Sequence, residues 1–231
     1  LCNNRNFYRQ YNSASTQIFY KYQSMEKDLN YLINKSKILR KHVIEMVARQ
    51  GKGYVQQGLG ASDLFSVLFF DELKNINIVS NINRDRFFLS TAHNSALFHA
   101  TMAEKGLINI DSLKDYCLDG SPLEINVSER LGPFVEATCG SLGQGLSVAI
   151  GMALSAKRRK LKSRFYVILG DGELQEGQTW EAILSASSWK MDNLCLVVDY
   201  NNMQVEGSVD QVMSLEPLID KFLSFGWNTI S

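Results

Sequence analysis

Hydrophobic positions in the first third of the chain recur with a helical period. From Leu29 they are spaced by three, four and seven residues, as on the buried face of an amphipathic helix. Gly51 and Gly53 interrupt this spacing, so the helix is predicted to end there. A second helix is predicted to begin at Ser62, whose hydroxyl is a suitable N-cap for the apolar run that follows it.

Further along the chain, a short apolar segment is followed by two helical ones. The run RFFLS at 86–90 predicts a strand, and residues 95–105 predict a helix. Residues 140–160 begin rich in glycine and then become amphipathic, which predicts a glycine loop that leads into a helix.

Two apolar strands and the helix between them are the clearest unit of the second half. Residues 165–169 and 194–198 are continuous apolar runs, and a helical pattern over 177–190 separates them. Strands that are apolar throughout are typical of a parallel sheet covered on both faces. The sequence therefore predicts an α/β fold that contains a parallel βαβ unit. One face of its helix is predicted to carry Trp180, Ile183, Leu184 and Ser187.

The composition narrows the class of protein. The 231 residues include 24 basic and 24 acidic side chains, so the chain lacks the positive excess that attracts nucleic acid. An apolar content of 45% excludes wholesale disorder. The longest apolar runs are far shorter than the about 20 residues that cross a bilayer. We expect a globular domain without a nucleic-acid or membrane partner.

Cysteine usage indicates a reducing compartment. The four cysteines form no CxxC pair, and the three histidines offer little material for a zinc site. We interpret the thiols as reduced and expect a cytoplasmic location.

The first 24 residues differ from the rest in composition. They contain three basic residues and no acidic one, and Met25 opens a segment that resembles an ordinary protein start. We expect residues 1–24 to be a disordered upstream extension and residues 25–231 to be the domain. A transit peptide is the alternative, because such peptides are basic, contain serine and lack acids.

Polar residues follow both strands of the βαβ unit. Asp171 comes directly after the first strand, and Asn201 follows the second. Because parallel strands end at the same edge of a sheet, the two side chains can converge on one point. A carboxylate and an amide oxygen suit Mg²⁺ or Ca²⁺ and leave coordination positions open for water and phosphate. Gly170 and Gly172 let backbone amides approach a bulky anion.

Other phosphate-binding motifs are absent from the sequence. No GxxxxGK[ST] segment occurs, and the glycines of 140–145 do not fit GxGxxG. The combination of Asp171, its flanking glycines and Asn201 therefore predicts a site for a metal-bridged diphosphate.

These residues belong to longer motifs with a specific order along the chain. The motifs are DR at 85–86, LSTAH at 89–93, VE at 135–136, GSLGQGLS at 140–147, GDGELQEG at 170–177, WEA at 180–182, DNL at 192–194, DYNNMQ at 199–204, PL at 217–218 and FGW at 225–227. Together they closely resemble the thiamine diphosphate fingerprint of transketolases. The resemblance is greatest to the N-terminal subunit of two-chain transketolases, and it covers roughly residues 35–230.

The resemblance implies a fold, a reaction and partners. The fold is the thiamine-diphosphate-binding one, a three-layer α/β/α arrangement around a mostly parallel sheet. The reaction is the transfer of a two-carbon ketol unit from a ketose phosphate, with thiamine diphosphate and Mg²⁺ as cofactors. Ca²⁺ is the alternative metal that the oxygen ligands suit. The glutamate that activates the cofactor comes from a pyrimidine-binding domain, so we expect a second subunit, an α₂β₂ assembly and no activity of the chain alone. The family's chain normally continues past residue 231, so this end is expected to be a truncation.

The resemblance also implies roles for single residues. Asp171 and Asn201 match the side-chain metal ligands, and the backbone carbonyl of Met203 matches the third protein ligand. Gly172 matches a contact to the diphosphate, and Gly140 and Leu142 match residues along the thiamine ring. Gly170, on the other side of Asp171, is expected to bind the cofactor as well.

Two further matches concern catalysis. His93 matches a histidine near the diphosphate and the reacting carbon. Glu176 matches an acid at the subunit interface that helps to hold the partner's activating glutamate. Glu173 is interpreted as a first-turn acid, which suits a helix N-terminus without a further role.

The substrate end departs from the family pattern. Tyr54 and Asn126 stand where two histidines usually contact the sugar and assist proton transfer, and Ala92 replaces a glycine before His93. A tyrosine with an ordinary pKa near ~10 is a poor base at pH 7, and asparagine does not titrate. Cofactor binding is therefore expected to be intact and substrate contacts to be changed.

These departures leave two alternatives to ketol transfer between sugars. The chain could belong to an enzyme that passes a two-carbon acyl unit to a lipoyl or carrier-protein thiol. It could also be a non-catalytic paralogue that retains the cofactor, although the intact metal-site residues argue against this.

Overall fold

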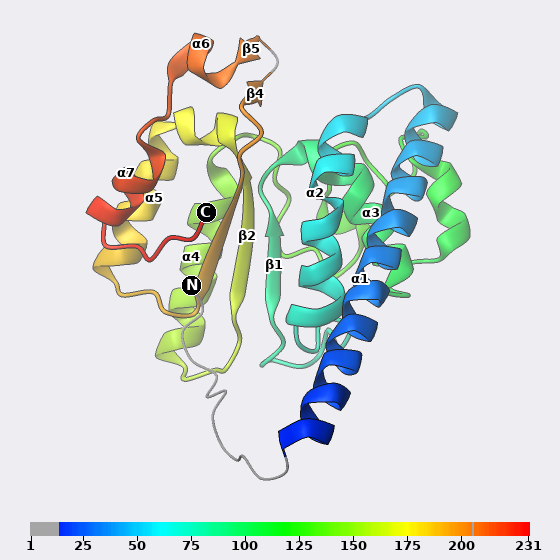
Figure 1. Ribbon diagram of the computed structural model, residues 1–231. Helices are drawn as coiled ribbons and strands as arrows, with labels where there is room; N and C mark the ends of the chain where they lie inside the picture. The colour runs from blue at the N-terminus through cyan, green and yellow to red at the C-terminus, as the bar shows by residue number, and fades with distance from the viewer. Residues whose placement is uncertain (1–13, 205) are drawn as a thin grey trace.

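A three-stranded parallel sheet forms the centre of the molecule (Figure 1). The computed structural model describes the backbone of residues 14–204 and 206–231, with side chains from residue 28 onward. The strands, in the order β1-β2-β3, are β1 (Arg86–Leu89), β2 (Phe165–Gly170) and β3 (Leu194–Asp199). β2 is central, and Gly170 at its end pairs with Asp199 at the end of β3.

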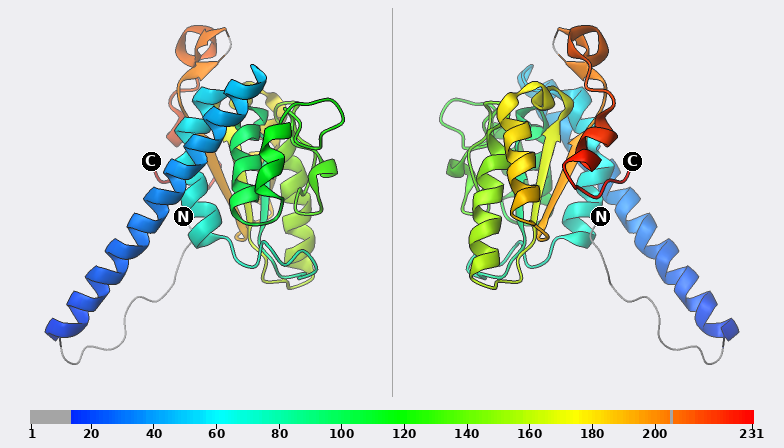
Figure 2. Two further views of the ribbon diagram at one scale, coloured as in Figure 1. Left: turned by 90° about the vertical axis from the view of Figure 1, so that its right-hand side faces the viewer. Right: turned by 90° about the vertical axis from the view of Figure 1, so that its left-hand side faces the viewer.

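Helices cover both faces of this sheet (Figure 2). The layer on one face consists of α1 (Ala14–Gln50), α2 (Val55–Val67), its continuation as a π-helical turn η1 (Leu68–Glu72), and α3 (Ser95–Glu104). The layer on the other face consists of α4 (Gln144–Arg158), α5 (Gly177–Ser188) and α7 (Leu218–Ser224). The result is a three-layer α/β/α fold, as the sequence predicts.

Short elements lie mainly in the connections. The short 3₁₀ helices are η2 (Ala92–Asn94), η3 (Ile110–Asp115), η4 (Glu129–Leu131) and η5 (Asp171–Gln175). After β3 comes a small projection of β4 (Met203–Gln204), β5 (Gly207–Ser208) and α6 (Val209–Met213). In Figure 1 this projection lies beyond the ends of the strands.

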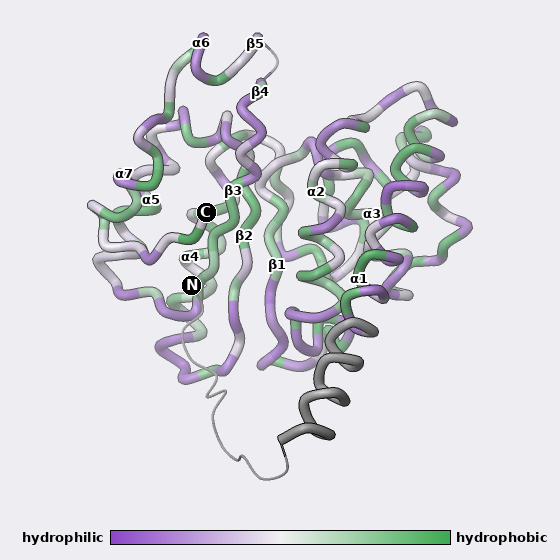
Figure 3. The backbone as a smooth tube through the Cα atoms, viewed as in Figure 1, coloured by the Kyte–Doolittle hydropathy of each residue, from purple (hydrophilic) through white to green (hydrophobic). Residues whose placement is uncertain are grey.

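Alternate strand residues enter two separate cores. Tyr166 and Ile168 of β2 pack with the layer of α1, α2 and α3, whereas Phe165, Val167 and Leu169 pack with α4 and α5. This follows from the two-residue period of a strand, and it explains why β2 is hydrophobic throughout. Figure 3 shows the same hydrophobic character along β3.

The predicted strands and most helices are confirmed, but three details were wrong. Ser62 does not cap a helix: α2 begins at Val55, and the Ser62 hydroxyl donates to the carbonyl of Gly58 within it. Leu184 is 54% exposed, because the buried face of α5 is formed by Thr179, Ala182, Ile183 and Ala186. β3 is only partly buried along its whole length, since it pairs with β2 on one side only.

The N-terminal boundary also differs from the expected one. The first helix begins at Ala14, earlier than the predicted start near Leu29. Residues 1–13 of the expected disordered extension lie outside the described part of the chain. Over the described residues, none of the helices combines the length and the hydropathy needed to span a membrane.

Candidate functional site

The C-terminal edge of the sheet gathers the predicted metal-binding residues. Asp171 follows β2 and opens the turn η5, and the loop after β3 carries Asn201. β2 and β3 are parallel neighbours, so these two segments meet at one edge.

Asp171 is buried and is contacted by the loop from β3. The residue is only 3% exposed, and its two carboxylate oxygens accept hydrogen bonds from different backbone amides. Oδ1 accepts from the amide of Gly172 at 2.9 Å, and Oδ2 accepts from the amide of Asn202 at 2.7 Å. Burial raises the pKa of the Asp171 carboxyl, while the amides around it act in the opposite direction.

The loop after β3 offers further oxygen atoms. Oδ1 of Asn201 accepts a hydrogen bond from the amide of Met203 at 3.0 Å, which fixes the loop locally. Oδ1 of Asn202 is buried and has no hydrogen-bond partner. A Cβ placed on Gly172 would meet no atom within 4 Å, so there is open space next to the carboxylate.

These observations fit a divalent cation with an attached diphosphate. A desolvated carboxylate gains from a nearby cation, and amide and carbonyl oxygens complete a hard-oxygen ligand set. The residues that could bind the metal are Asp171, Asn201 and the carbonyl of Met203. The open space at Gly172 leaves room for phosphate oxygens.

The glycine loop at 140–145 lies against the same edge. Gly143 has a φ of +79°, and a Cβ there would lie 2.9 Å from the Gln178 side chain. Nε2 of Gln178 donates to the carbonyl of Leu142 at 3.0 Å. The loop is therefore close-packed against α5 at Leu142 and Gly143, while Gly145 contacts Ser90 at the end of β1.

Glu173 is the important residue that the sequence interpretation missed. It is 1% exposed, and Oε1 accepts hydrogen bonds from Ser90 Oγ at 2.6 Å and the Gly143 amide at 3.0 Å. Oε2 accepts from the Gly170 amide at 3.1 Å, and burial raises the pKa of this carboxyl. A first-turn acid is normally exposed, so no local pattern in the sequence distinguishes this one.

Glu176 lies nearby but on the surface. It precedes the first residue of α5, its side chain is exposed, and its amide donates to the carbonyl of Glu173 at 3.2 Å. The Glu176 carboxylate is therefore exposed at this edge, and its implied interface role stays a prediction.

His93 and Tyr54 form a pair from different elements. Their rings meet edge to face with centroids 4.6 Å apart. His93 lies in η2 directly after β1, and Tyr54 precedes α2. Partial burial lowers the pKa of His93, so its imidazole is predominantly neutral at pH 7.

Asn126 lies on a long segment between α3 and α4. A Cβ on Gly140 would lie 3.4 Å from Cγ of Asn126, so the amide faces the start of the glycine loop. The two predicted substrate residues thus have neighbours among the other predicted site residues: Tyr54 contacts His93, and Asn126 lies against Gly140.

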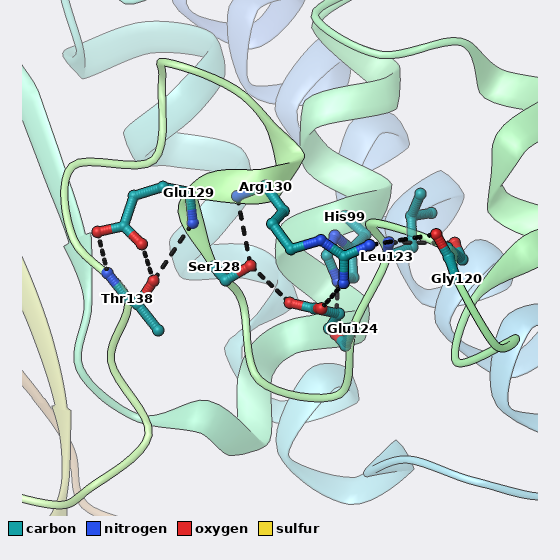
Figure 4. Close-up of polar contacts among 9 residues, drawn as sticks. His99, Gly120, Leu123, Glu124, Ser128, Glu129, Arg130 and Thr138 are labelled. Carbon is teal, nitrogen blue, oxygen red and sulfur yellow. Dashed lines mark hydrogen bonds and ion pairs between the residues drawn. The ribbon is translucent and has the colours of Figure 1, made fainter.

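Polar contacts fix the shape of the segment that carries Asn126 (Figure 4). Nε2 of His99 lies 2.8 Å from the carbonyl of Glu124, which can only accept, so Nε2 carries the proton. The Glu124 carboxylate accepts from Ser128 Oγ at 2.5 Å and also pairs with Arg130. The segment therefore has internal supports on both sides of residue 126.

Comparison with known proteins identifies the family of this chain. A family model described as the thiamine diphosphate binding domain of transketolase matches residues 32–231. The chain belongs to the transketolase family. It carries the family's thiamine diphosphate binding domain, which corresponds to the N-terminal region.

Two sequence relatives within the transketolase family are of similar extent. A putative uncharacterized transketolase family protein of Sinorhizobium fredii is 40% identical over 197 residues, covering 85% of this chain and 71% of that protein. The 6-deoxy-6-sulfo-D-fructose transketolase subunit of a Clostridium species is 35% identical, covering 87% of this chain and 73% of that subunit.

The transketolase of Campylobacter jejuni provides a structural match. Its crystal structure superposes with a TM-score of 0.78 and 30% identity, over 85% of this chain. The chain spans only 32% of that longer transketolase. The three-layer fold around β1, β2 and β3 is therefore similar to one part of a full-length transketolase.

Proposed function

We propose that the chain is the diphosphate-binding subunit of a two-chain transketolase. The enzyme would transfer a two-carbon ketol unit from a ketose phosphate with thiamine diphosphate and Mg²⁺. The observation that carries the proposal is the buried carboxylate of Asp171, which meets the loop of Asn201 at the ends of two neighbouring parallel strands.

The chain's own residues would bind and orient the cofactor. Asp171, Asn201 and the carbonyl of Met203 would bind the metal, and Gly170 and Gly172 would lie beside the diphosphate. Gly140 and Leu142 would contact the thiamine ring. When bound, thiamine diphosphate supplies an electron sink for carbanion chemistry.

Other residues would act at the substrate. His93, neutral at pH 7 because burial lowers its pKa, can donate a hydrogen bond to or accept one from the donor sugar. Tyr54 orients His93 through ring contact and can donate its own hydroxyl proton in a hydrogen bond. Asn126 can orient a substrate hydroxyl without changing its charge.

A second subunit would complete the site. The matched relative from Clostridium is called a transketolase subunit, and Glu176 presents an exposed carboxylate at the sheet edge. We propose that a pyrimidine-binding subunit docks over this edge in an α₂β₂ assembly, and that Glu176 helps to hold the activating glutamate of that subunit. A cytoplasmic location is proposed from the free thiols of Cys117, Cys139 and Cys195.

Loss of the Asp171 charge tests the cofactor site. In calorimetric titrations with thiamine diphosphate and Mg²⁺, Asp171→Asn should lower the affinity by about 100-fold or more, because a metal ligand loses its charge. The matched control is Asp192→Asn, because Asp192 is an exposed acid that pairs with Lys157. Equal affinities of the wild type and Asp171→Asn would contradict the proposal.

Turnover tests the need for a partner. The isolated chain should not consume xylulose 5-phosphate, and activity should appear when the second subunit is added. Steady ketol transfer by the chain alone would contradict the two-chain proposal.

An alternative acceptor is favoured by one observation, the replacement of both substrate histidines by Tyr54 and Asn126. With these residues, the two-carbon unit could pass to a lipoyl or carrier-protein thiol instead of a sugar. Transfer between sugars at ordinary rates in the assembled enzyme would exclude this alternative.

A further inference from the structure

Glu173 connects three segments that are far apart in the sequence. Its donors are the hydroxyl of Ser90 after β1, the amide of Gly143 in the glycine loop and the amide of Gly170 at the end of β2. The carboxylate is buried, and it lies between the glycine loop and the strand ends. All three hydrogen bonds converge on two oxygen atoms.

The glycine loop is in close contact with its neighbours around this carboxylate. A Cβ on Gly145 would lie 2.5 Å from Ser90 Oγ and 3.0 Å from its Cα. On the opposite side, Gln178 donates to the Leu142 carbonyl. The position of the loop therefore depends on its contacts with Ser90, Glu173 and Gln178.

The end of β2 and the glycine loop are held in place by different interactions. The end of β2 is fixed by the ladder, because Leu169 and Gly170 pair with Val198 and Asp199 of β3. The glycine loop belongs to no ladder, and its amide at Gly143 is bonded to Glu173. Loss of Glu173 should therefore move the loop more than the strand ends.

We propose that Glu173 is a positioning residue that sets the distance between the two halves of the cofactor site. One half is the glycine loop with Gly140 and Leu142, and the other is the strand end with Asp171 and Gly172. This inference rests on the proposed function, because it takes the first half to contact the thiamine ring and the second to contact the diphosphate.

The chemistry requires a carboxylate at this position. Glutamine has one acceptor oxygen in place of two, so Glu173→Gln would turn an NH₂ group toward at least one of the three donors. Either the Gly170 amide or the pair formed by Ser90 and Gly143 would then face a donor and not an acceptor. The side chain would keep its volume and lose its ability to connect the segments.

Two probes of different length test the proposal by calorimetry in the full protein, with its second subunit present. Thiamine diphosphate with Mg²⁺ needs both halves of the site, whereas inorganic pyrophosphate with Mg²⁺ needs only the strand end. Glu173→Gln should lower the affinity for thiamine diphosphate about tenfold or more and that for pyrophosphate less than about threefold. A general loss of structure would lower both affinities together.

The matched control lies at the other end of β2. Glu72 also accepts two hydrogen bonds, from Arg164 at 3.0 Å and from the Tyr166 hydroxyl at 2.8 Å. Glu72→Gln should leave the ratio of the two affinities unchanged. Ser90→Ala, which removes one donor and keeps its Cβ, provides a milder variant if Glu173→Gln does not fold.

Each outcome distinguishes the inference from the proposed function. Selective loss of thiamine diphosphate binding in Glu173→Gln, or a smaller selective loss in Ser90→Ala, supports the positioning role. Equal changes for both probes, or no change, overturn that role and leave the proposed function standing. Failure of the wild-type protein to bind either probe overturns the proposed function itself.

Discussion

Asp171 is a buried carboxyl group that the stability of the fold does not explain. The residue is 3% exposed, and burial raises the pKa of its carboxyl, so the ionised form is disfavoured relative to water. The amides of Gly172 and Asn202 compensate only in part. A buried carboxylate of this kind is more typical of a ligand-binding site than of a stabilising interaction.

His99 predicts a measurable dependence of stability on pH. Complete burial lowers the pKa of this histidine to about 4, so the folded protein contains it uncharged. The unfolded chain binds a proton below about 6.5, whereas the folded protein does not until about 4. The free energy of unfolding should therefore fall as the pH is lowered from about 6.5 to about 4, by up to about 3 kcal/mol from this residue.

Urea unfolding of the wild type and His99→Gln at several pH values isolates this contribution. Glutamine does not titrate and can still donate to the carbonyl of Glu124. The difference in unfolding free energy between the two proteins should change across that pH interval and be constant above about pH 7. A difference that is independent of pH would contradict the assignment.

At the scale of elements, the start of α4 packs closely against the residue that follows β1, with too little room for a Cβ between them. This packing depends on Gly145, which faces Ser90. Gly151 lies on the same helix, but a Cβ there would meet nothing within 4 Å. The two glycines thus belong to one helix, with Gly145 in its first turn and Gly151 in its interior, and have different surroundings.

Alanine at these two positions should change stability in opposite directions. Gly145→Ala should destabilise the protein by about 1–3 kcal/mol, because Ser90 and its backbone would have to shift. Gly151→Ala should stabilise it by about 0.5–1 kcal/mol, because alanine favours a helix interior. Thermal or urea unfolding measures both, and effects of the same sign would contradict the packing described here.

The same scale shows where local sequence patterns misled. The Ser62 hydroxyl bonds a carbonyl within α2, so a residue that favours N-caps lies inside a helix. Leu184 was predicted to share one face of α5 with Ile183, but Ile183 is buried with Ala182 and Ala186 whereas Leu184 is exposed. The first error arises because a serine hydroxyl can bond a carbonyl within a helix as well as cap its start, and the second because a local pattern does not specify which side of a helix the sheet will cover.

At the scale of the whole molecule, ligand binding should be linked to folding. The proposed site joins segments from β1, β2, β3 and the glycine loop, so it exists only in the folded protein. Thiamine diphosphate with Mg²⁺ at about 100 times its dissociation constant should add about 2.7 kcal/mol to the free energy of unfolding. Thermal unfolding with and without the two ligands measures this gain.

Metal removal provides the control for that experiment. Addition of EDTA in the presence of thiamine diphosphate should abolish most of the stabilisation, because the diphosphate would lose its bridge to Asp171. Stabilisation that survives the chelator in full would contradict a metal-bridged site.

The amino-acid sequence by itself determined the strands, most of the helices and the family. Apolar runs such as 165–169 have a period and length that favour buried parallel strands, and the GDG motif with Asn201 identifies the sheet edge. These features depend on neighbouring residues, so they can be interpreted without coordinates.

Only the tertiary structure decided how distant residues meet at that edge. The bond between Ser90 and Glu173 joins positions 83 residues apart, and the contact of Tyr54 with His93 joins two different elements. Such contacts leave no periodic signal, because they result from the packing of α2, the glycine loop and α5 around the sheet. The role of Glu173 therefore follows from its burial and its donors, which the sequence could not specify.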